Sequence, residues 1–271
     1  MGEVYLAEHL LLRRPCAIKL IRPEHTGDPR NLARFEREVQ ATATLTNWHT
    51  VEIFDYGRAT DGTFYYVMEY LPGLNLEQLV AAEGPLPADR VVHLWLQVAE
   101  ALREAHGIGL IHRDIKPSNI ITGRRGGHED VAKLLDFGLV LAPTAAEDEA
   151  RLTQQDTIAG TPSYMSPEQA AGQDTVDARS DIYSLGAVAY FLLTGRPPFL
   201  GKNSLQILAA HRHEPVQPPR NLCPDLPADL EAVVVRCLEK DSTRRFTDAD
   251  QLIQALRKCQ STVTYLSHTR T

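Results

Sequence analysis

The stretch His112–Asn119 reads HRDIKPSN in one-letter code and places an acid, a base and an amide within eight positions. Such a density of polar groups is rarely needed for packing, so we interpret the stretch as a loop that carries chemistry. A second acid, Asp136, opens the sequence Asp-Phe-Gly directly after an apolar pair, where a strand is expected to end. Between the two motifs, short extended segments at 120–121 and 131–135 flank a Gly126-Gly127 turn, which predicts a small hairpin.

The chain before this loop is predicted to be rich in short strands. Apolar or aromatic runs lie at 4–7, 16–21, 51–56 and 63–70. The pair Asp61-Gly62 is typical of a hairpin turn between the last two of these runs. One helix is expected over 31–45, because apolar residues recur there on a single helical face.

After Pro72-Gly73 the pattern changes to long helical segments. We expect these helices at 88–106, 181–193, 228–238 and 248–258. The sequence therefore predicts an α+β fold in which a strand-rich part and a helix-rich part meet at 69–73, with a ligand cleft between them. The polar stretch 144–156 is interpreted as a loop, and residues 260–271 as a loose polar tail.

Composition excludes several classes of protein. With a formal charge of -7 and a pI of about 5.8, the chain lacks the Lys/Arg surplus that nucleic-acid binding requires. The apolar stretch 185–194 is too short to span a bilayer, and the first residues lack the features of a signal peptide. The four scattered cysteines form no Cys-x-x-Cys pair, so we expect reduced thiols and a cytoplasmic protein with no membrane segment.

Further motifs appear in a fixed order around these two. Ala17-Ile18-Lys19 lies in an expected strand, Glu38 on the following helix, and Ser166-Pro167-Glu168 after the second acid. Together the motifs resemble the protein-kinase family, and most of all its serine/threonine kinases of bacterial type, from Gly2 to about Lys258. The resemblance implies a two-lobed fold with a small antiparallel sheet and one helix at 1–71, a larger and mainly helical lobe at 72–259, and the tail at 260–271.

The resemblance also implies roles in phosphoryl transfer from ATP. Lys19 would hold the α- and β-phosphates and would itself be held by Glu38. Asp114 would orient the substrate hydroxyl and accept its proton, and Lys116 would stabilise charge on the γ-phosphate. Magnesium, with manganese as an alternative ion, would be carried by the hard oxygen ligands of Asn119 and Asp136.

An adenine slot is implied at the junction of the two lobes. By resemblance, backbone groups of Glu69 and Leu71 would meet the adenine edge, with Met68 behind them. Apolar walls would come from Val4, Ala17 and Ile121, and Gly2 would be the last glycine of the phosphate loop.

Other residues are expected to support the site without touching substrate. The resemblance implies that Asp181 holds the backbone of the catalytic loop and that Glu168 pairs with Arg245. His112 lies beside an apolar stretch, and we interpret it as a packed structural histidine.

The expected function is a serine/threonine protein kinase that acts on protein substrates; the sequence leaves the oligomeric state open. The alternative is a pseudokinase or nucleotide-sensing scaffold, which binds partners without transferring phosphate. Because Lys19, Asp114, Asn119 and Asp136 are all present, transfer is favoured. Regulation by phosphorylation of the loop is expected, with Thr153 and Thr157 as acceptors and Arg113 and Arg34 as partners of the phosphate, although unmodified loop threonines are the alternative.

The sequence departs from the family pattern in two places that bear on function. The chain begins Met-Gly-Glu-Val, so only the last glycine and the valine of the glycine-rich loop are present. An upstream extension through such a loop is therefore expected to tighten magnesium-ATP binding and raise the melting temperature. Asn75 and Ser118 stand where arginine-directed kinases often have acids, so a preference for arginine before the target residue is not expected.

Overall fold

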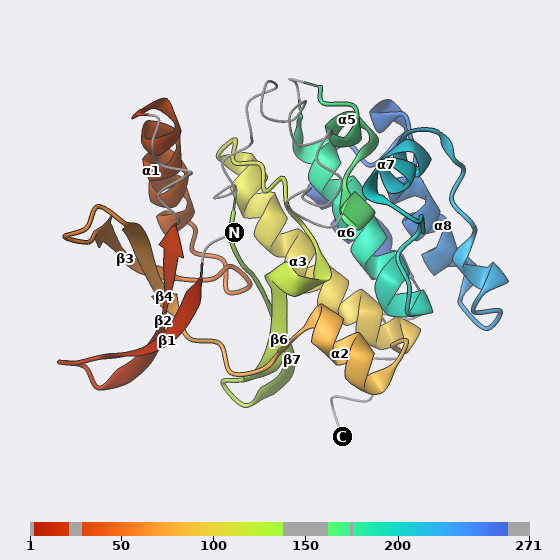
Figure 1. Cartoon of the computed structure of the whole chain (residues 1–271). Coiled ribbons are helices and arrows are strands. Elements are labelled where there is room, and N and C mark those ends of the chain that lie inside the picture. Colours follow the sequence, from red (N-terminus) through yellow and green to blue (C-terminus); the bar gives the residue numbers. More distant parts are fainter. Residues whose placement is uncertain (1–2, 22–28, 138–161, 174–175, 260–271) are drawn as a thin grey trace.

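The computed structural model describes residues 3–21, 29–137, 162–173 and 176–259, with 29–35 as backbone only. A strand-rich part and a helix-rich part lie side by side, on the left and right of Figure 1, which confirms the expected α+β fold. We call the part up to residue 71 the N-lobe and the part from residue 72 the C-lobe. The predictions for 144–156 and 260–271 lie outside the described residues.

The N-lobe is one antiparallel sheet with one helix. Its strands are β1 (Val4–His9), β2 (Arg14–Ile21), β3 (Ile53–Arg58) and β4 (Phe64–Glu69), in the order β1-β2-β4-β3. Burial along β4 alternates over its first five residues, as expected of a strand with one face on a core. The helix α1 (Pro29–Ala43) contacts β3, and its Val39 is fully buried. The N-lobe core is a small cluster of seven buried side chains: Ala17, Ile21, Val39, Val51, Phe64, Tyr66 and Met68.

The C-lobe is built around a buried helix, α6 (Ala178–Thr194), in which every residue from Ser180 to Leu193 is buried. Gly186 allows α6 to approach the helix that ends at Cys237, because a Cβ at position 186 would lie 2.4 Å from Cβ of Cys237. The other helices are α2 (Leu76–Glu83), α3 (Ala88–Gly107), α5 (Pro167–Ala170), α7 (Ser204–His213), α8 (Ala228–Cys237) and α9 (Ala249–Lys258). Among the described residues no helix is long and apolar enough to cross a membrane.

A second, three-stranded sheet lies between the N-lobe and these helices, and two of its strands, β6 and β7, are drawn in green in Figure 1. It consists of β5 (Leu74–Asn75), β6 (Ile120–Arg125) and β7 (His128–Leu134), and β6 and β7 form the predicted hairpin. Both turn glycines have positive φ, 57° at Gly126 and 84° at Gly127, which the turn requires and which glycine adopts without strain. Short 3₁₀ turns lie at Pro117–Asn119, Pro162–Tyr164, Pro219–Asn221 and Ser242–Arg244.

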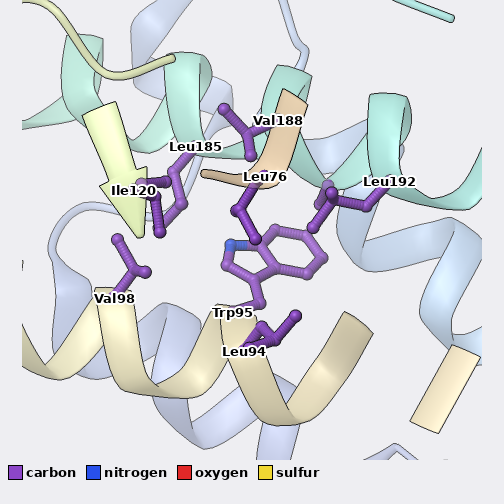
Figure 2. A pocket seen from close by; sticks show the side chains of 9 residues that line it. Leu76, Leu94, Trp95, Val98, Ile120, Leu185, Val188 and Leu192 are labelled. Atoms are coloured by element: carbon purple, nitrogen blue, oxygen red, sulfur yellow. The ribbon is translucent and has the colours of Figure 1, made fainter. Parts of the chain in front are cut away.

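The C-lobe core is close-packed beneath this sheet. Figure 2 shows the indole of Trp95 among apolar side chains from α2, α3, β6 and α6. The cavity that they line has a volume of about 10 Å³, which is room for at most about one water molecule. The packing around Trp95 therefore leaves almost no void beneath the second sheet.

Residues 49–51 form a backbone seam between the two lobes. The amide of Val51 donates to the carbonyl of Leu134 at 3.0 Å, and the amide of Leu134 donates to the carbonyl of His49 at 2.8 Å. Glu104 of α3 also accepts the amides of Thr46 and Asn47, at 2.9 and 2.8 Å. The N-lobe is thus hydrogen-bonded directly to the strand that leads to Asp136.

The seam explains one difference from the sequence prediction. A strand was expected from Val51, whereas β3 begins at Ile53, because the amide of Val51 is bonded to β7 rather than to β4. The helices α2, α5 and α7 were not predicted. None of them has the long apolar stripe from which the other C-lobe helices were predicted, and two of those helices, α8 and α9, are no longer than α7.

Candidate active site

The segment His112–Asn119, which we call the catalytic loop after its expected role, holds the carboxylate of Asp114 from two sides. Nζ of Lys116 lies 3.0 and 2.8 Å from the two carboxylate oxygens of Asp114. Nδ2 of Asn119 donates to Oδ2 of Asp114 at 3.0 Å and to its carbonyl at 2.8 Å. Three of the predicted site residues are therefore in direct contact.

The backbone of this loop is anchored by a buried acid from α6. Asp181 accepts the amide of His112 at 2.8 Å and the amide of Arg113 at 2.9 Å, as expected. Nε2 of His106 lies 2.8 Å from the same carboxylate. Arg113 has a φ of 66°, a conformation uncommon for a residue with a side chain. The charged acceptor therefore holds the loop in a conformation that it would not adopt without support.

His112 is a structural residue, as predicted. Its side chain is fully buried, and its ring lies 4.8 Å from that of Phe137. Nδ1 accepts the amide of Asp114 at 3.2 Å, so Nε2 carries the hydrogen and donates to the carbonyl of Leu135 at 2.7 Å. His112 thereby connects the catalytic loop to the residue that precedes Asp136.

Asp136 is held by two donors from the N-lobe sheet. Nζ of Lys19 lies 2.6 Å from Oδ2, and the hydroxyl of Tyr66 donates to Oδ1. Burial favours the neutral acid, but Lys19 and Tyr66 outweigh it, so the pKa of Asp136 lies below its ordinary value. Burial and the adjacent Asp136 carboxylate raise the pKa of Tyr66 well above its ordinary value, so this hydroxyl stays protonated and donates. Asp136 is therefore ionised at neutral pH.

The expected contact between Lys19 and Glu38 is replaced by other partners in this structure. Among the ion pairs of the described residues, Lys19 is paired with Asp136, and Glu38 lies 3.8 Å from Nη1 of Arg113. The physical reason is position: α1 directs Glu38 towards the catalytic loop, while β2 brings Lys19 to the nearer carboxylate, that of Asp136. Glu38 thus contacts the site through the residue that precedes Asp114.

Three residues of the predicted adenine slot, Val4, Ala17 and Met68, lie on neighbouring strands of the N-lobe sheet. Val4 is opposite Lys19, and Ala17 is opposite Met68. Met68 and Glu69 are buried at the end of β4, whereas Leu71 and Ile121 are half-buried. Gly2 lies outside the described residues, as do Thr153, Thr157 and the side chain of Arg34.

A buried ion-pair cluster around Glu69, at the end of β4, was not predicted. Glu69 accepts Nζ of Lys133 at 2.7 Å and the amide of Glu52 at 2.9 Å, and its other oxygen pairs with Arg125. Lys133 also donates to the carbonyl of Thr50 at 3.0 Å. Burial lowers the pKa of Lys133, and the bond to Glu69 opposes this shift. Because Glu69 ends β4 while Lys133 and Arg125 belong to the C-lobe sheet, the cluster connects the two lobes.

Glu168 and Arg245 form the expected pair in the C-lobe. The two oxygens of Glu168 lie 2.8 and 2.9 Å from Nη1 and Nη2 of Arg245. The side chain of Arg245 is completely buried and also donates to backbone carbonyls of Arg179, Glu239 and Lys240. Burial raises the pKa of Glu168, but Arg245 and Ser180 outweigh it, so the pKa lies below its ordinary value.

The oxygen donors near Asp136 fit a divalent cation whose coordination shell is completed by phosphate oxygens. Nδ2 of Asn119 faces Asp114, which leaves the amide oxygen as the metal donor of this side chain. The backbone brings the two residues together, since the amide of Leu135 donates to the carbonyl of Asn119 at 2.9 Å. In the described part of the chain, no three His, Cys, Asp or Glu side chains form a metal-binding group. One carboxylate and one amide oxygen are hard donors, which suit a hard divalent cation that keeps several other ligands.

Comparisons with known sequences agree with this geometry. Serine/threonine-protein kinase pkn3 of Myxococcus xanthus is 38% identical over 252 residues, which cover 92% of this chain and 46% of that protein. Serine/threonine-protein kinase PknB of Mycobacterium leprae is 38% identical over 255 residues, covering 93% of this chain and 40% of that protein. The chain thus spans less than half the length of these curated relatives.

Solved structures share the fold. The PknI kinase domain of Mycobacterium tuberculosis has a TM-score of 0.72 at 32% identity, over 95% of this chain and 91% of that one. Rad53 1-466 in complex with AMP-PNP has a TM-score of 0.74 over 94% of this chain and 61% of that one; at 24% identity it shows the fold alone. The family described as Protein kinase domain matches residues 1–256. With this match and the arrangement of Lys19, Asp114 and Asp136, the chain belongs to the protein kinase domain family.

Proposed function

We propose that this domain is a serine/threonine protein kinase, which transfers the γ-phosphate of ATP to a hydroxyl group of a protein. The observation that carries the proposal is the Asp114 carboxylate, which Lys116 and Asn119 hold from two sides above a backbone anchored by Asp181. A restrained acid of this kind can take a proton from a positioned hydroxyl group. The names of the bacterial relatives support the serine/threonine assignment.

Each residue then has a role in positioning or in neutralising charge. A substrate hydroxyl donates its proton to a carboxylate oxygen of Asp114 as the γ-phosphate is transferred to the hydroxyl oxygen. Lys116, already beside that carboxylate, stabilises the negative charge that develops on the phosphate. Lys19 holds the α- and β-phosphates, and Glu38 takes up Lys19 when the lysine leaves Asp136.

The same site would bind the nucleotide and the divalent cation. Glu69 and Leu71 receive the adenine edge between Met68, Val4, Ala17 and Ile121, and Gly2 approaches the phosphates. Asn119 and Asp136 hold magnesium, or manganese in its place. The bound ion supplies positive charge that neutralises the β- and γ-phosphates.

Substrates, location and control complete the proposal. The partners are proteins rather than nucleic acids, in keeping with the net charge of -7. A cytoplasmic site of action agrees with the supply of ATP there and with four cysteines that form no disulfide in the structure. Phosphorylation of Thr153 or Thr157 activates the domain by pairing with Arg113.

Replacement of the proposed base tests the function. Asp114→Asn should lower phosphate transfer by about a hundredfold or more while ATP binding stays nearly unchanged, because the carboxylate acts on the hydroxyl group. Transfer is measured with labelled ATP on a generic protein substrate, and binding by calorimetry. Asp250→Asn, an exposed acid on α9, is the control and should retain full activity. Near-normal turnover of Asp114→Asn would reject the assignment, and no transfer by the unaltered protein would favour a nucleotide-sensing scaffold.

A further inference from the structure

Tyr66 is a buried tyrosine whose ring and hydroxyl have separate environments. Its ring belongs to the N-lobe core with Ala17, Val39 and Met68, and only 1% of the residue is exposed. A phenylalanine would fill such an apolar site without the cost of burying a hydroxyl group. The hydroxyl finds its partner outside this cluster, on Oδ1 of Asp136, which is 70 positions away in the sequence.

The sheet register fixes this contact. Lys19 of β2 and Tyr66 of β4 are directly opposite each other in the antiparallel pair, so both side chains leave the same face of the sheet. The ammonium of Lys19 also lies 5.9 Å from the centroid of the Tyr66 ring. Because the ring is enclosed by the core, the hydroxyl is held in place by packing as well as by its hydrogen bond.

The two neighbours divide the carboxylate of Asp136 between them. Lys19 takes Oδ2 at 2.6 Å and Tyr66 takes Oδ1. Asp136 itself has a φ of 56°, so its backbone stands in the left-handed region and the side chain needs external support. Lys19 has a second task on the phosphates in the proposed function, whereas the hydroxyl of Tyr66 has no other hydrogen-bond partner among the described contacts. Tyr66 is therefore the donor that can stay on Asp136 throughout the reaction cycle.

We propose that Tyr66 is a positioning residue for the divalent cation, and that it acts by orienting the carboxylate of Asp136. This inference rests on the proposed function, in which Asp136 carries the ion. A carboxylate oxygen can accept a hydrogen bond and still bind a cation through its other lone pair. Hydrogen bonds that orient a metal ligand in this way are typically worth about ten- to a hundredfold in metal affinity.

The test removes the hydroxyl and leaves the ring. Tyr66→Phe should weaken Mn²⁺ binding in the presence of AMP-PNP by about tenfold, measured by electron paramagnetic resonance of free Mn²⁺. AMP-PNP binding without a divalent cation should be unchanged, and near-UV circular dichroism should report an intact core. Tyr65→Phe is the matched control: this neighbour is on the same strand, and its hydroxyl lies towards Gly57 of β3. It should bind Mn²⁺ as the unaltered protein does.

Two further variants separate the inference from the proposed function. Asp136→Asn should abolish the Mn²⁺-dependent gain in AMP-PNP affinity, and Tyr66→Phe should then have no additional effect in that background. If Asp136→Asn retains Mn²⁺ binding, the assigned ligand is wrong and the proposed function fails at this point. If Asp136→Asn behaves as expected but Tyr66→Phe binds Mn²⁺ with unchanged or higher affinity, the positioning role of Tyr66 is overturned while the proposed function stands.

Discussion

Two glutamates, Glu168 and Glu38, were each expected to pair with one basic residue, and only Glu168 does so. Glu168 has a bidentate pair with Arg245, in which both contacts are below 3 Å. Glu38 lies 3.8 Å from Arg113, while its expected partner Lys19 is bonded to Asp136. The difference follows from the elements that carry the residues rather than from the residues themselves.

Glu168 and Arg245 belong to segments packed on the C-lobe core. Ser180 and Arg245 both bind the carboxylate of Glu168, and Arg245 is held further by three backbone carbonyls. Glu38 is on α1, which packs on a small cluster of seven buried side chains, and its neighbour Arg113 is 40% exposed. A pair within a close-packed core has one arrangement, whereas a pair between a helix and a loop of different lobes can change partners.

The ion-pair cluster around Glu69 shows that an ion pair between the two lobes is not always long or open to a change of partners. Glu69 and Lys133 also belong to different lobes, yet they are 2.7 Å apart and both buried. Both residues are on strands, and the hydrogen bonds of the seam at 49–51 fix β7 relative to the N-lobe. An ion pair therefore keeps one arrangement where the backbone of both residues is fixed, by packing on one core for Glu168 and Arg245 and by hydrogen-bonded strands for Glu69 and Lys133.

The largest expected effect on stability comes from breaking the ion pair between Glu168 and Arg245. Arg245→Met should lower the free energy of unfolding by about 3–5 kcal/mol, because the carboxylate of Glu168 is left buried without its partner. Urea unfolding monitored by circular dichroism measures the loss. The control is Arg244→Met, since Arg244 is exposed and lies 3.4 Å from Glu239, and its loss should be below about 1 kcal/mol. Equal effects of the two variants would mean that burial does not distinguish these pairs.

Lys133→Met tests the pair that crosses between the lobes. It should cost about 1.5–3 kcal/mol of unfolding free energy, less than Arg245→Met, because Arg125 still neutralises Glu69. Adding Glu69→Gln should cost less than the sum of the two single changes, since the carboxylate that Lys133→Met leaves behind is then removed. Additive losses in this double-mutant cycle would show that the two side chains are not coupled.

Acid should remove the stabilisation that the ion pair between Glu168 and Arg245 gives to the fold. Because the pKa of Glu168 is lower in the folded protein than in the unfolded chain, its ionised form stabilises the fold above the unfolded pKa, near 4.5. This stabilisation is lost as the pH falls through the folded pKa. The difference in unfolding free energy between the unaltered protein and Glu168→Gln should therefore shrink between pH 5 and pH 3, as measured by urea titrations across that range. A constant difference would contradict the ion-pair interpretation.

The smallest effect on stability is expected at the other glutamate. Glu38→Gln should lower the unfolding free energy by less than Arg245→Met does, because the 3.8 Å between Glu38 and Arg113 is longer than the contacts between Glu168 and Arg245. Phosphate transfer should nevertheless fall if Glu38 receives Lys19 during turnover, so turnover and unfolding are measured on the same preparation. A loss of stability as large as that of Arg245→Met would remove the contrast between the two glutamates.

Periodicity and motif order were enough to predict much of the fold. The hairpin at Gly126-Gly127 and the long helix from Ala88 were predicted because turn residues and repeating apolar faces are local signals. The helices α2, α5 and α7 were missed because they lack a long apolar stripe, and packing on the core stabilises them. The start of β3 at Ile53 depends on a hydrogen bond to Leu134, a contact with no local signal.

The candidate site was predictable only in part, because contacts between residues distant in the sequence leave no local signal. Asp114, Lys116 and Asn119 are close in sequence, and their contacts follow from one loop. Tyr66 and Lys133 were overlooked, since each acts on a residue more than 60 positions away and resembles an ordinary strand residue. The alternation along β4 places Tyr66 on the buried face, and a hydroxyl at a buried position was the one available signal.

The seam at residues 49–51 also has a consequence for hydrogen exchange. The amides of Val51 and Leu134 are bonded across the lobes, so both become accessible to solvent only when this short connection opens. Opening it would also free the backbone that leads to Asp136. The seam is therefore expected to open with the C-lobe core and not with the outer strands, so β1 can exchange its amides many times while the base of the N-lobe stays protected.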